Sequence, residues 1–507
     1  MQRQYYIFFV VFWFFFCTLE LMILDFYKIF MWFSLETIVS WAKRKWFAYP
    51  WSDIYGWLAN AWDLWPYGVE LQKNIQDNRW NFFVRSRQDV IWLDSQILMN
   101  PKVWEASGHV GGFSDPLVDC KKCNSRARAD QLIEEFIKKN NTEQSEIQEK
   151  IWVDNLTPEA RTFKQQADFL ETYKIKCPKC GSCDWTEPKS FNLMFKTKQW
   201  IVEWEWKDIY LRPETAQGIF VNFRNVLDTT RSRIPFGIAQ IGKAFRNEIT
   251  PGNFMFRVME FYQMEIEFFC ENDEKEWMKW FEYWKQESKK WREEEIGISP
   301  EKLTFRDHDK DELSFYSKWT CDVEYEFPRG WGELQGIAYR TDYDLNQHVE
   351  HSGKDMQYAD PNTGKRYIPH VVEPSRGLTR AVLTAMIDSY DEEKYTDGNG
   401  NEATRTVAKF HKNIAPIKYA ILPLIKKDEE QVKIAKDIFT KLAKKYTCEY
   451  DDGWAIGKRY RRQDEIGTPF CVTVDQQSCE DGNVKLRDMD TMEQKRVKIE
   501  ELESFMD

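Results

Sequence analysis

The stretch FGIAQIGKAFRNEITPGNFMFRVMEFYQMEIEFF (236–269) decides the fold of this 507-residue chain. It lies in a longer segment, 191–270, where apolar and polar residues alternate, a pattern typical of antiparallel strands. The run ITPGNFM (249–255) predicts a short loop between two such strands. Residues 305–387 return to strand patterns and close with an apolar helix. The patterns therefore predict antiparallel strands together with helices, an α+β class of fold.

Three segments of this region carry the charges that chemistry needs. They are RPETAQ (212–217), FRNE (245–248) with its continuation to residue 265, and EPSRGLTR (373–380). Their arginines are permanent cations with planar forks that match phosphate. These arginines are Arg246, Arg257 and Arg380. The carboxylates in strand-like contexts, which we expect to be partly buried, are Glu214, Glu248, Glu265 and Glu333.

A site with arginines at one end and carboxylates at the other fits a ligand of the reverse polarity. ATP together with an amino acid is such a ligand, because the arginines take the triphosphate and the carboxylates take the ammonium group and Mg²⁺. For one isolated Arg or Glu, a surface ion pair is the better interpretation. The clustering of three such segments favours a shared nucleotide site.

Two Cys-x-x-Cys pairs flank a polar helical stretch in residues 115–190. The pairs are Cys120 with Cys123 and Cys177 with Cys180. Four thiolates fill the tetrahedral shell that structural zinc prefers, so we expect a zinc-ribbon-like insertion without an open coordination position and without catalysis. Four free buried cysteines are the less favoured alternative, and Cys183 could replace one ligand.

The charged segment 271–295 carries aromatic residues at helical intervals. They are Trp277, Trp280, Phe281, Trp284 and Trp291. This pattern predicts an amphipathic helix that covers the core. The polar segment DEEKYTDGNGNEATRT (391–406) predicts a linker or loop. A strand (IKYAILPL, 417–424), a charged helix at about 428–446 and further strands predict a separate α/β domain at the C-terminal end.

Composition excludes some classes of protein. The net charge of −11 excludes a generic basic nucleic-acid coat, so any nucleic-acid contact must come from local patches. Eleven cysteines, without the density of a secreted scaffold, favour a reducing compartment. The uncharged run at residues 5–19 is shorter than the ~20 residues of a membrane helix. A membrane anchor or signal and a buried helix are alternatives, and a non-native extension with translation starting near Met31 is favoured.

About nine-tenths of the chain, from residue 34 onward, resembles glycyl-tRNA synthetases of the dimeric bacterial and eukaryotic type, which are class II aminoacyl-tRNA synthetases. The resemblance rests on IYGWLANAWDLWPYGVEL (54–71), LRPETAQGIF (211–220), FGIAQIGKAFRNEITPGNFMFR (236–257), GWGELQGIAYRTDYDL (330–345) and VVEPSRGLTR (371–380). It implies an antiparallel catalytic sheet with flanking helices and an α/β anticodon-binding domain. It further implies a cytoplasmic homodimer of protein biosynthesis, with no membrane partner.

The resemblance also implies a division of the chain. Residues 1–33 would be an apolar extension, and residues 34–114 the N-terminal part of the catalytic domain with motif one. Residues 115–190 would be the cysteine-paired insertion, residues 191–408 the catalytic core with motifs two and three, and residues 409–507 the anticodon-binding domain.

At matching positions the resemblance implies an ATP site. Arg246 resembles the motif-two arginine on the α-phosphate, and Arg380 the motif-three arginine on the γ-phosphate. Glu248 would hold the adenine amino group, Phe256 would stack on the ring, and Glu333 would lie beside ATP and its Mg²⁺. The implied catalytic residues are Arg246, Glu248, Glu333 and Arg380. The implied ATP-binding set is Arg246, Asn247, Glu248, Phe256, Arg257, Val258, Met259, Glu260, Phe261, Glu333, Leu334, Gly377, Leu378, Thr379 and Arg380.

The same resemblance implies a glycine site. Glu214, Glu265 and Ser375 would surround the amino acid, with Arg128 as a further contact. Carboxylates around the ammonium group leave no room for a side chain, so a methyl group must be rejected by crowding. The implied glycine-binding set is Arg128, Glu214, Phe261, Tyr262, Gln263, Met264, Glu265, Glu373, Pro374, Ser375, Arg376 and Gly377.

The implied reaction needs no protein nucleophile. The glycine carboxylate attacks the α-phosphorus of ATP, pyrophosphate leaves, and the terminal hydroxyl of tRNA(Gly) attacks glycyl-adenylate. Catalysis then rests on positioning and charge neutralisation. For tRNA, the run GKRYRRQ (457–463) offers basic side chains on an otherwise acidic protein, and phosphate contact is at least as favoured as a solvated face. These side chains are Lys458, Arg459, Arg461 and Arg462.

The chain departs from the family pattern in two ways. Met259 and Tyr262 replace residues that are commonly Arg and Glu in the family, which puts some contacts of the ATP loop in doubt. Tryptophan also stands at ten positions where the family has glycine, several of them in turns that need positive φ. These are Trp46, Trp51, Trp57, Trp65, Trp92, Trp185, Trp200, Trp204, Trp206 and Trp454.

The composition agrees with such a replacement. The chain has 23 Trp and 23 Gly, whereas ordinary usage of ~7% would give about 35 Gly. We hypothesise that the gene uses UGA as a glycine codon and that it is written here as tryptophan. Genuine drift to tryptophan is the alternative, and UGG codons at these positions would establish it.

Two other functions compete with the glycine ligase. A non-enzymatic, synthetase-like nucleic-acid-binding accessory subunit should lack the phosphate arginines and the ammonium-binding glutamates, which this chain retains. A class II enzyme for serine, threonine or proline is disfavoured by the combination of RPETAQ, QMEIE and GWGEL.

Overall fold

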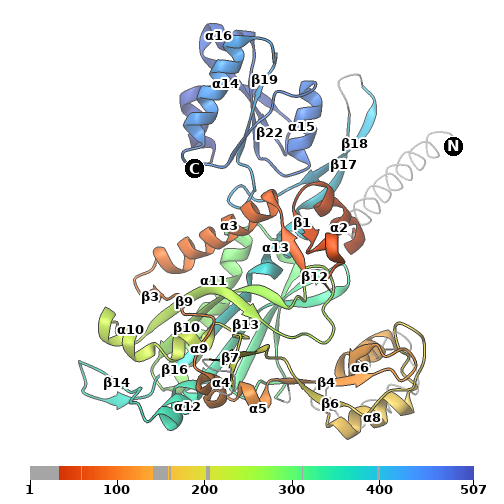
Figure 1. Ribbon diagram of the computed structural model, residues 1–507. Helices are drawn as coiled ribbons and strands as arrows, with labels where there is room; N and C mark the ends of the chain where they lie inside the picture. The colour runs from red at the N-terminus through yellow and green to blue at the C-terminus, as the bar shows by residue number, and fades with distance from the viewer. Residues whose placement is uncertain are drawn as a thin grey trace, which may run out of the picture.

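The computed structural model describes residues 33–58, 60–140, 158, 161–200, 206–310, 312–396 and 400–506. Figure 1 shows a central body built on a large sheet, a C-terminal domain above it and a smaller lobe at its lower right that carries α6 and α8. The apolar extension expected at residues 1–33 lies outside the described residues except for its last residue. Among the described residues, no helix has the length and apolar character needed to cross a bilayer.

The central sheet has seven strands in the order β11-β12-β13-β16-β10-β9-β3. All neighbours are antiparallel except β3 and β9. The strands are β3 (Val90–Trp92), β9 (Phe236–Phe245), β10 (Glu260–Cys270), β11 (Leu303–Asp307), β12 (Trp319–Phe327), β13 (Gly330–Thr341) and β16 (His370–Gly377). The expected hairpin of 236–269 is confirmed, since β9 and β10 pair from Phe245 opposite Glu260 to Phe236 opposite Phe269.

Three helices cover one face of this sheet: α3 (Pro66–Trp80), α11 (Glu274–Lys290) and α13 (Leu378–Ser389). The predicted amphipathic helix is confirmed as α11, in which Phe281 and Trp284 are buried. Alternate residues of β10, among them Met264 and Phe268, face these helices in the main core. The intervening residues of β10 therefore point to the opposite face. The predicted α+β class is confirmed.

Short elements complete the body. Before β3 lie α2 (Leu35–Arg44), β1 (Ala48–Pro50), η1 (Asp53–Tyr55), β2 (Trp62–Leu64) and η2 (Asn81–Arg85). Between β3 and β9 lie α4 (Pro101–Ala106), α5 (His109–Gly112), α9 (Ala216–Phe220) and α10 (Phe223–Thr230). Between the later strands lie η3 (Trp291–Glu295), η4 (Pro300–Lys302), α12 (Tyr343–Ser352), β14 (Tyr358–Ala359) and β15 (Arg366–Tyr367). The Gly-rich segment 108–113 contains the one-turn helix α5.

The lobe at the lower right of Figure 1 holds the two cysteine pairs. Its elements are β4 (Ser114–Asp119), β5 (Arg126–Arg128), α6 (Ala129–Asn140), α8 (Phe163–Thr172) and β6 (Lys189–Asn192). β4 pairs with both β5 and β6, and α6 packs on α8. The strands β7 (Lys196–Trp200) and β8 (Trp206–Tyr210) then return the chain to the body.

The C-terminal domain is a five-stranded α/β unit, as expected, with strand order β20-β19-β21-β22-β23. Its strands are β19 (Tyr419–Pro423), β20 (Cys448–Tyr450), β21 (Phe470–Val474), β22 (Asn483–Asp488) and β23 (Gln494–Lys498). Its helices are α14 (Glu429–Leu442), α15 (Ile456–Asp464), α16 (Gln476–Asp481) and η5 (Ile499–Phe505).

The expectation of a linker or loop at 391–406 is wrong. β17 (Tyr390–Thr396) and β18 (Glu402–Ala408) form an antiparallel hairpin there. Their polar composition hides the strand pattern, because the buried residue of β18 within this segment is Arg405, and the buried Val407 on the same side lies just beyond it. Arg405 is buried and paired with both Glu393 and Asp464, which links the hairpin to the C-terminal domain.

The backbone at two of the ten tryptophans agrees with the glycine hypothesis. Trp46 has a φ of 60° and Trp454 a φ of 73°, in the left-handed region that bulky residues disfavour. Trp46 follows the C-cap of α2, and the amide of Phe47 donates to the carbonyl of Ala42 (2.9 Å). This is the Schellman arrangement, whose left-handed residue is usually glycine.

Most of these tryptophans are also exposed. Seven of the ten are exposed, between 42% and 74%, namely Trp46, Trp51, Trp57, Trp65, Trp92, Trp206 and Trp454. Trp185 is buried, the side chain of Trp200 is not described, and Trp204 lies outside the described residues.

Candidate active site

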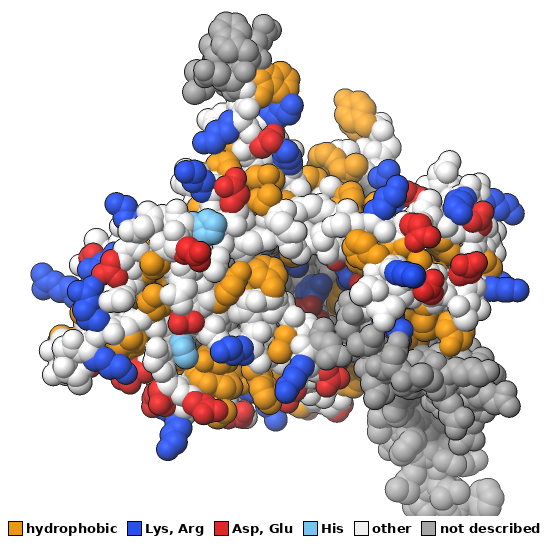
Figure 2. Space-filling model, turned by 90° about the horizontal axis from the view of Figure 1, so that it is seen from below, with side chains coloured by type: hydrophobic (Ala, Val, Ile, Leu, Met, Phe, Trp, Pro, Cys, Tyr) orange, Lys and Arg blue, Asp and Glu red, His pale blue; other side chains and the backbone are white. Residues whose placement is uncertain are grey.

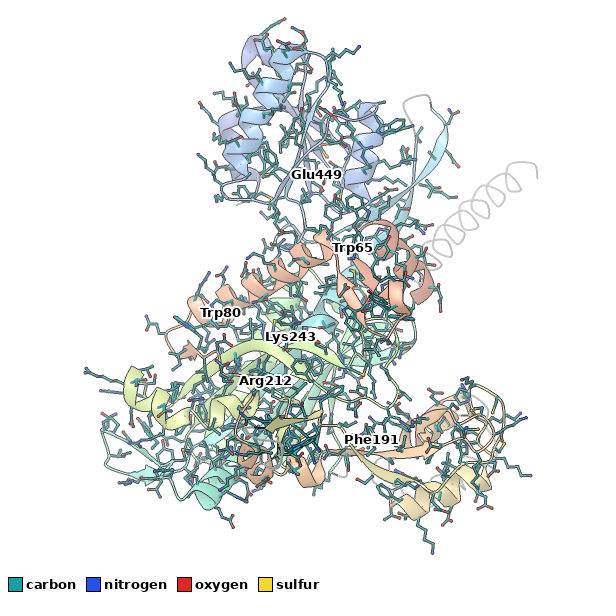
Figure 3. The ribbon with its side chains drawn as sticks, viewed as in Figure 1. Trp65, Trp80, Phe191, Arg212, Lys243 and Glu449 are labelled. Carbon is teal, nitrogen blue, oxygen red and sulfur yellow. The ribbon has the colours of Figure 1, made fainter. Side chains whose placement is uncertain are left out.

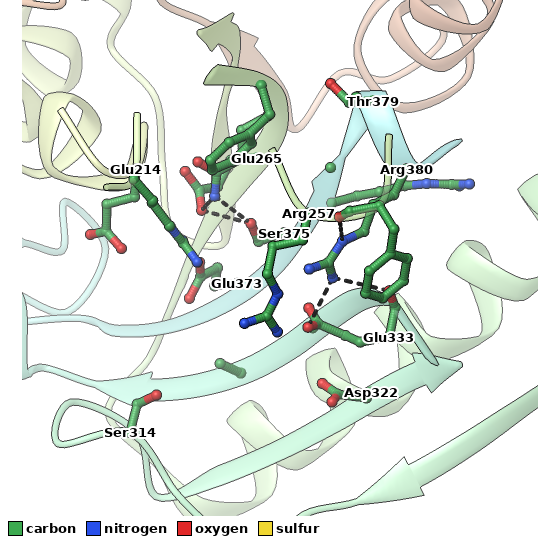
Figure 4. Close-up of a pocket in the computed structure, with 18 of the residues that line it drawn as sticks. Glu214, Arg257, Glu265, Ser314, Asp322, Glu333, Glu373, Ser375, Thr379 and Arg380 are labelled. Carbon is green, nitrogen blue, oxygen red and sulfur yellow. Dashed lines mark hydrogen bonds and ion pairs between the residues drawn. The ribbon is translucent and has the colours of Figure 1, made fainter. Parts of the chain in front are cut away.

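A cavity of about 270 Å³ lies on the face of the central sheet opposite α3, α11 and α13. In the view from below in Figure 2, the body is hollowed near its centre, and charged side chains are visible inside the hollow. The close-up in Figure 4 shows that β10 and β16 contribute one side of the cavity and β12 and β13 the other. The cavity therefore draws on all three segments in which the sequence concentrates charge.

The cavity is acidic at one end, where Glu265 is held by three neighbours. The hydroxyl of Ser375 donates to its carboxylate (2.7 Å), as does the side-chain amide of Gln263 (2.7 Å). The hydroxyl of Thr215 donates to the second carboxylate oxygen. Residues 263 and 265 alternate with the core-facing Met264 on β10, so the strand periodicity places both in the cavity. These bonds fix the orientation of a buried carboxylate.

Arg340 organises the remaining carboxylates of this end. Its guanidinium is fully buried, pairs with Asp344 (2.8 Å) and Glu373 (2.9 Å), and lies 3.7 Å from Glu214. Burial alone would raise the pKa of Glu214, but the nearby His109 and Arg340 hold that pKa well below its usual range. Glu214 therefore remains anionic although it is buried, and it can face a cation.

The loop that carries Glu214 is anchored to β9 by Arg212. The guanidinium of Arg212 donates to the backbone carbonyls of Lys243 (2.7 Å) and Ser95 (2.8 Å). Figure 3 shows Arg212 and Lys243 close together in the middle of the body. A Cβ at Gly242 would lie 2.2 Å from this guanidinium, so the close approach requires glycine at that position. RPETAQ is thereby tied to the sheet at its first residue.

The opposite end of the cavity is basic. Arg257 lies there, and Arg380 donates to the carboxylate of Glu333 (3.0 Å). Arg246 also lines the cavity, and its Nε donates to the carbonyl of Pro213 (3.2 Å), next to Glu214. In Figure 4, Arg257, Arg380 and Glu333 lie on the far side of the cavity from Glu214. Glu214 and Glu265 thus lie away from Arg257 and Arg380, as the sequence predicts. Glu248 and Glu333 do not, because they lie among the arginines, 3.6 Å from Arg257 and 3.0 Å from Arg380 respectively.

Phe256 lies between two arginines at this end. The guanidinium carbon of Arg329 is 3.8 Å from its ring centroid and that of Arg380 is 4.4 Å away. A planar ligand that stacks on Phe256 would have to displace or cover one of these groups. Arg329 has no role in the sequence-based site, and its proximity to Phe256 is a finding of the structure.

The lobe with the cysteines reaches the loop between β9 and β10. The side-chain amide of Gln131 in α6 contacts Thr250 (3.0 Å) and Arg257 (2.7 Å). Arg257 also lies 3.6 Å from Glu248. Arg128 differs from its expected role as a substrate contact, because Asp115 (2.7 Å) and Asp130 (2.5 Å) already pair with it and it does not line the cavity.

Other predicted site residues fall outside the cavity. Three face the apolar core, where a ligand has no access: Met264, Leu334 and Leu378. Three line a different cavity of about 510 Å³ beside β1 and β2: Met259, Glu260 and Tyr262. Asn247 and Pro374 do not line the first cavity either. Arg376 borders it, but its guanidinium lies on the opposite face of the sheet, 4.4 Å from the ring centroid of Trp291.

The predicted residues that do line the cavity form one continuous set. They are Glu214, Arg246, Glu248, Phe256, Arg257, Val258, Phe261, Gln263, Glu265, Glu333, Glu373, Ser375, Gly377, Thr379 and Arg380.

Oxygen ligands suited to Mg²⁺ lie at the basic end. Glu333 and Asp322 both line the cavity. Burial raises the pKa of Asp322 to about 6, although the hydrogen bond with His308 (2.8 Å) acts against it, and the charge of Glu333 raises it further. A divalent cation would relieve this repulsion, and carboxylates are the ligands that Mg²⁺ takes. These residues therefore fit the cofactor.

Glu267 continues the acidic side of β10 beyond Glu265. It is fully buried, and neither of its carboxylate oxygens has a hydrogen-bond partner among the described residues. Burial, reinforced by the neighbouring Glu373, raises the pKa of Glu267 well above its usual range. An isolated buried carboxylate is costly, so this group is held in its neutral form.

The four paired cysteines meet in the lobe. Their Sγ atoms lie within 4.8 Å of one another, with Cys120 to Cys180 at 3.5 Å and Cys123 to Cys177 at 3.8 Å. Zn–S bonds of about 2.3 Å in a tetrahedron place sulfurs ~3.8 Å apart, so the cluster fits zinc. Cys183 lies outside the cluster and donates to the carbonyl of Lys174.

The basic run of α15 is divided between surface and interior. Lys458 and Arg461 are exposed, and Arg462 pairs with Asp451. Arg459 is buried and donates to the carbonyls of Pro423 (2.6 Å) and Asp451 (3.0 Å). The expected contact between Arg459 and tRNA phosphate is therefore wrong for this conformation, because its guanidinium is occupied by the backbone.

Sequence reasoning missed several residues of the site. Arg340 and Asp344 lie in GIAYRTDYDL, a segment that carries the family resemblance, but their role depends on partners distant in sequence. His109 approaches Glu214 (3.5 Å) from the Gly-rich region, and His308 approaches Asp322 from the loop after β11. No spacing pattern connects these residues, so the sequence alone offered no way to find them.

Comparison with known proteins agrees with this geometry. The family model of the class II tRNA synthetase core domain (G, H, P, S and T) matches residues 195–394, and that of the anticodon binding domain matches residues 418–507. A prolyl-tRNA synthetase structure from Cryptosporidium parvum, with halofuginone and AMPPNP, has a TM-score of 0.57 at 15% identity, covering 92% of this chain and 75% of that chain. This likeness shows the fold alone.

Curated relatives are much more similar in sequence. The glycine–tRNA ligase of Geobacillus thermodenitrificans is 54% identical over 474 residues, which is 94% of this chain and 97% of the relative. That of Caldanaerobacter subterraneus subsp. tengcongensis is 52% identical over 474 residues, or 94% of this chain and 98% of the relative. The chain therefore belongs to the glycine–tRNA ligase family of class II aminoacyl-tRNA synthetases.

Proposed function

We propose that the protein activates glycine with ATP and transfers it to the 3′ end of tRNA(Gly). The observation that carries this proposal is the cavity with Glu214 and Glu265 at one end, Arg257 and Arg380 at the other, and Arg246 held by the carbonyl of Pro213. A glycine ammonium at the acidic end and a triphosphate at the basic end would each meet opposite charge. Their reacting groups, the carboxylate and the α-phosphorus, would then meet between the two ends.

The chain's own residues orient this reaction. Arg246 on the α-phosphate would stabilise the charge that develops as the glycine carboxylate attacks and pyrophosphate leaves. When ATP binds, Arg380 would release the carboxylate of Glu333 and hold the γ-phosphate instead. The Glu333 carboxylate would then be free for Mg²⁺. Glu333 and Asp322 would hold that ion, which neutralises phosphate charge when it is bound. Transfer of the glycyl group from the adenylate to the terminal hydroxyl of tRNA requires the same positioning and no protein nucleophile.

Selection of glycine would follow from crowding at the acidic end. Ser375 and Gln263 already fill two hydrogen-bonding directions of Glu265 (2.7 Å each). Arg340 holds Glu373 (2.9 Å) against the same space. Because these side chains are fixed by one another, they cannot move aside for a methyl group without breaking buried hydrogen bonds. Alanine would be rejected by that cost rather than by a lost contact.

The assignments of zinc, tRNA contacts, domains and oligomeric state are also proposals. We infer a structural Zn²⁺ on Cys120, Cys123, Cys177 and Cys180, supported by their sulfur separations. We infer tRNA contact through Lys458, Arg461 and Arg462, and the division into catalytic core, cysteine lobe and anticodon-binding domain described above. A cytoplasmic homodimer completes the proposal. The dimer is supported by the exposed apolar residues Ile54, Tyr55 and Leu58, the last of which lines the 510 Å³ cavity.

The proposal is tested by ATP–pyrophosphate exchange with the Glu265→Gln variant. The change keeps the shape of the side chain and removes the charge that faces the ammonium group. We expect at least a hundredfold loss of glycine-dependent exchange, because an unpaired buried charge costs several kcal/mol. Glu271→Gln, on the exposed residue just after β10, is the control and should leave exchange unchanged. Equal exchange by both variants would contradict the assignment of the acidic end.

A further inference from the structure

Three arginines are buried together beneath the central sheet, on the face away from the active-site cavity. Arg79 comes from α3, Arg292 from η3 and Arg376 from β16, and each is at most 4% exposed. Arg376 lies opposite Met264 on β10 and opposite Gln335 on β13. Its guanidinium therefore lies under the strand whose other face presents Glu373 and Ser375 to the cavity.

The hydrogen bonds of these arginines are incomplete. None of the three guanidinium nitrogens of Arg376 has a partner among the described residues, and Nε of Arg292 also has none. Arg292 donates through its other nitrogens to the carbonyl of Ser288 (2.6 Å) and the side chain of Gln335 (2.5 Å). Arg79 makes one long bond, to the carbonyl of Met264 (3.4 Å).

The charges of Glu265 and Glu293 act on Arg79 and Arg292 only from beyond ion-pair distance. In the described part of the chain, no Asp or Glu lies within ion-pair distance of any of the three. Other buried arginines pair with carboxylates, as Arg340 does with Asp344 (2.8 Å) and Arg487 with Asp464 (2.7 Å), or donate to backbone carbonyls, as Arg212 and Arg459 do. A guanidinium does not lose its proton in proteins, so the cluster concentrates positive charge in the core.

The aromatic neighbours offset part of this charge. The guanidinium of Arg376 lies 4.4 Å from the ring centroid of Trp291. The guanidinium of Arg79 lies 5.6 Å from the same centroid and 4.7 Å from that of Phe83. Cation–π contacts are weaker than the cost of taking an ion out of water, and they leave the mutual repulsion in place. Water could satisfy the N–H groups of Arg376 but would not neutralise them. A counter-anion does both.

We propose that Arg79, Arg292 and Arg376 form a buried binding site for a small monovalent inorganic anion of the halide class, with chloride as its ordinary occupant. The free N–H groups of Arg376 and the free Nε–H of Arg292 are its donors. An extended or organic anion is disfavoured, because all three guanidinium groups are enclosed by α3, η3 and the sheet. The bound anion neutralises the cluster and stabilises the layer that supports the floor of the active site.

The direct test is a crystal of the full chain grown or soaked in bromide, with data collected at the bromine absorption edge. The site predicts an anomalous peak enclosed by the three guanidinium groups. The absence of an anomalous peak in the cluster, in a crystal where surface bromides are visible, would overturn the proposal. A water molecule would then be the occupant.

Thermal unfolding gives a second, independent readout. With chloride exchanged stepwise for gluconate at constant ionic strength, we expect the melting temperature to fall by roughly 2–4 °C. Arg376→Leu should remove this dependence, because an apolar residue needs no counter-ion, and should melt no lower than the unsubstituted protein in gluconate. Arg85→Leu, on an exposed arginine of η2, is the control and should keep the dependence. The same chloride response in Arg376→Leu and the unsubstituted protein would contradict the site.

Discussion

The clearest prediction concerns Trp46, at the left-handed position that ends α2. We propose two substitutions there, Trp46→Gly and Trp46→Ala. Both remove the indole and its stacking on Tyr67, so the difference between them isolates the backbone. At a φ of 60° an L-residue with a Cβ is penalised by roughly 1–2 kcal/mol, whereas glycine is not.

The expected magnitude follows from two opposing terms. Glycine loses more conformational freedom on folding, which costs about 0.5–1 kcal/mol relative to alanine. The left-handed penalty of alanine exceeds that cost, so Trp46→Gly should be more stable than Trp46→Ala by about 0.5–1 kcal/mol. The Schellman bonds from the amides of Trp46 (3.4 Å) and Phe47 (2.9 Å) hold the backbone in this conformation in both variants.

Trp319 provides a matched control. It is about as exposed as Trp46, 49% against 53%, but lies at the start of β12 with ordinary strand geometry. There the order should reverse, with Trp319→Ala more stable than Trp319→Gly. Urea unfolding followed by circular dichroism measures all four variants. If Trp46→Ala is at least as stable as Trp46→Gly, the reasoning that this is a glycine site is refuted.

Three further predictions concern charge and metal. Because burial keeps Glu267 protonated in the fold while the unfolded side chain ionises above its ordinary pKa of 4.5, stability should fall as pH rises from 5 to 8. Glu267→Gln should lessen that fall in urea titrations, and an identical pH slope in both proteins would contradict a protonated Glu267. Arg340→Leu should destabilise the chain by about 3–5 kcal/mol, since it leaves Asp344, Glu373 and Glu214 buried without their cation; a melting temperature close to that of the unsubstituted protein would show that the carboxylates do not depend on Arg340. Removal of metal by a chelator should release one zinc per chain and lower the melting temperature, while Cys177→Ser should purify without zinc; full zinc content in Cys177→Ser would assign the metal to other ligands.

The strand periodicity made much of the fold predictable. The alternation in 236–269 gave β9 and β10, and the aromatic intervals in 271–295 gave α11. The same reasoning failed at 391–406, where both strands of the hairpin are polar. There Arg405 is stabilised in a buried position by Glu393 and Asp464, and those ion pairs cannot be read from local composition.

The site was predictable at positions where a single charged side chain has a role of its own. Glu214, Glu265, Arg246 and Arg380 share the cavity as expected. Arg376 shows the limit of transferring a whole motif, because neighbouring residues of a strand point to opposite faces, and Ser375 takes the cavity side. The network around Arg340 was not predictable, because its partners meet only after three separate segments have folded together.

Amino-acid-dependent ATP–pyrophosphate exchange by the unsubstituted protein tests the central claim most directly. The polarised cavity predicts exchange with glycine and none above background with alanine, serine, threonine or proline. Exchange with one of these instead of glycine would assign another substrate to the acidic end. No exchange with any amino acid would support a non-catalytic, synthetase-like accessory subunit and contradict the proposed function.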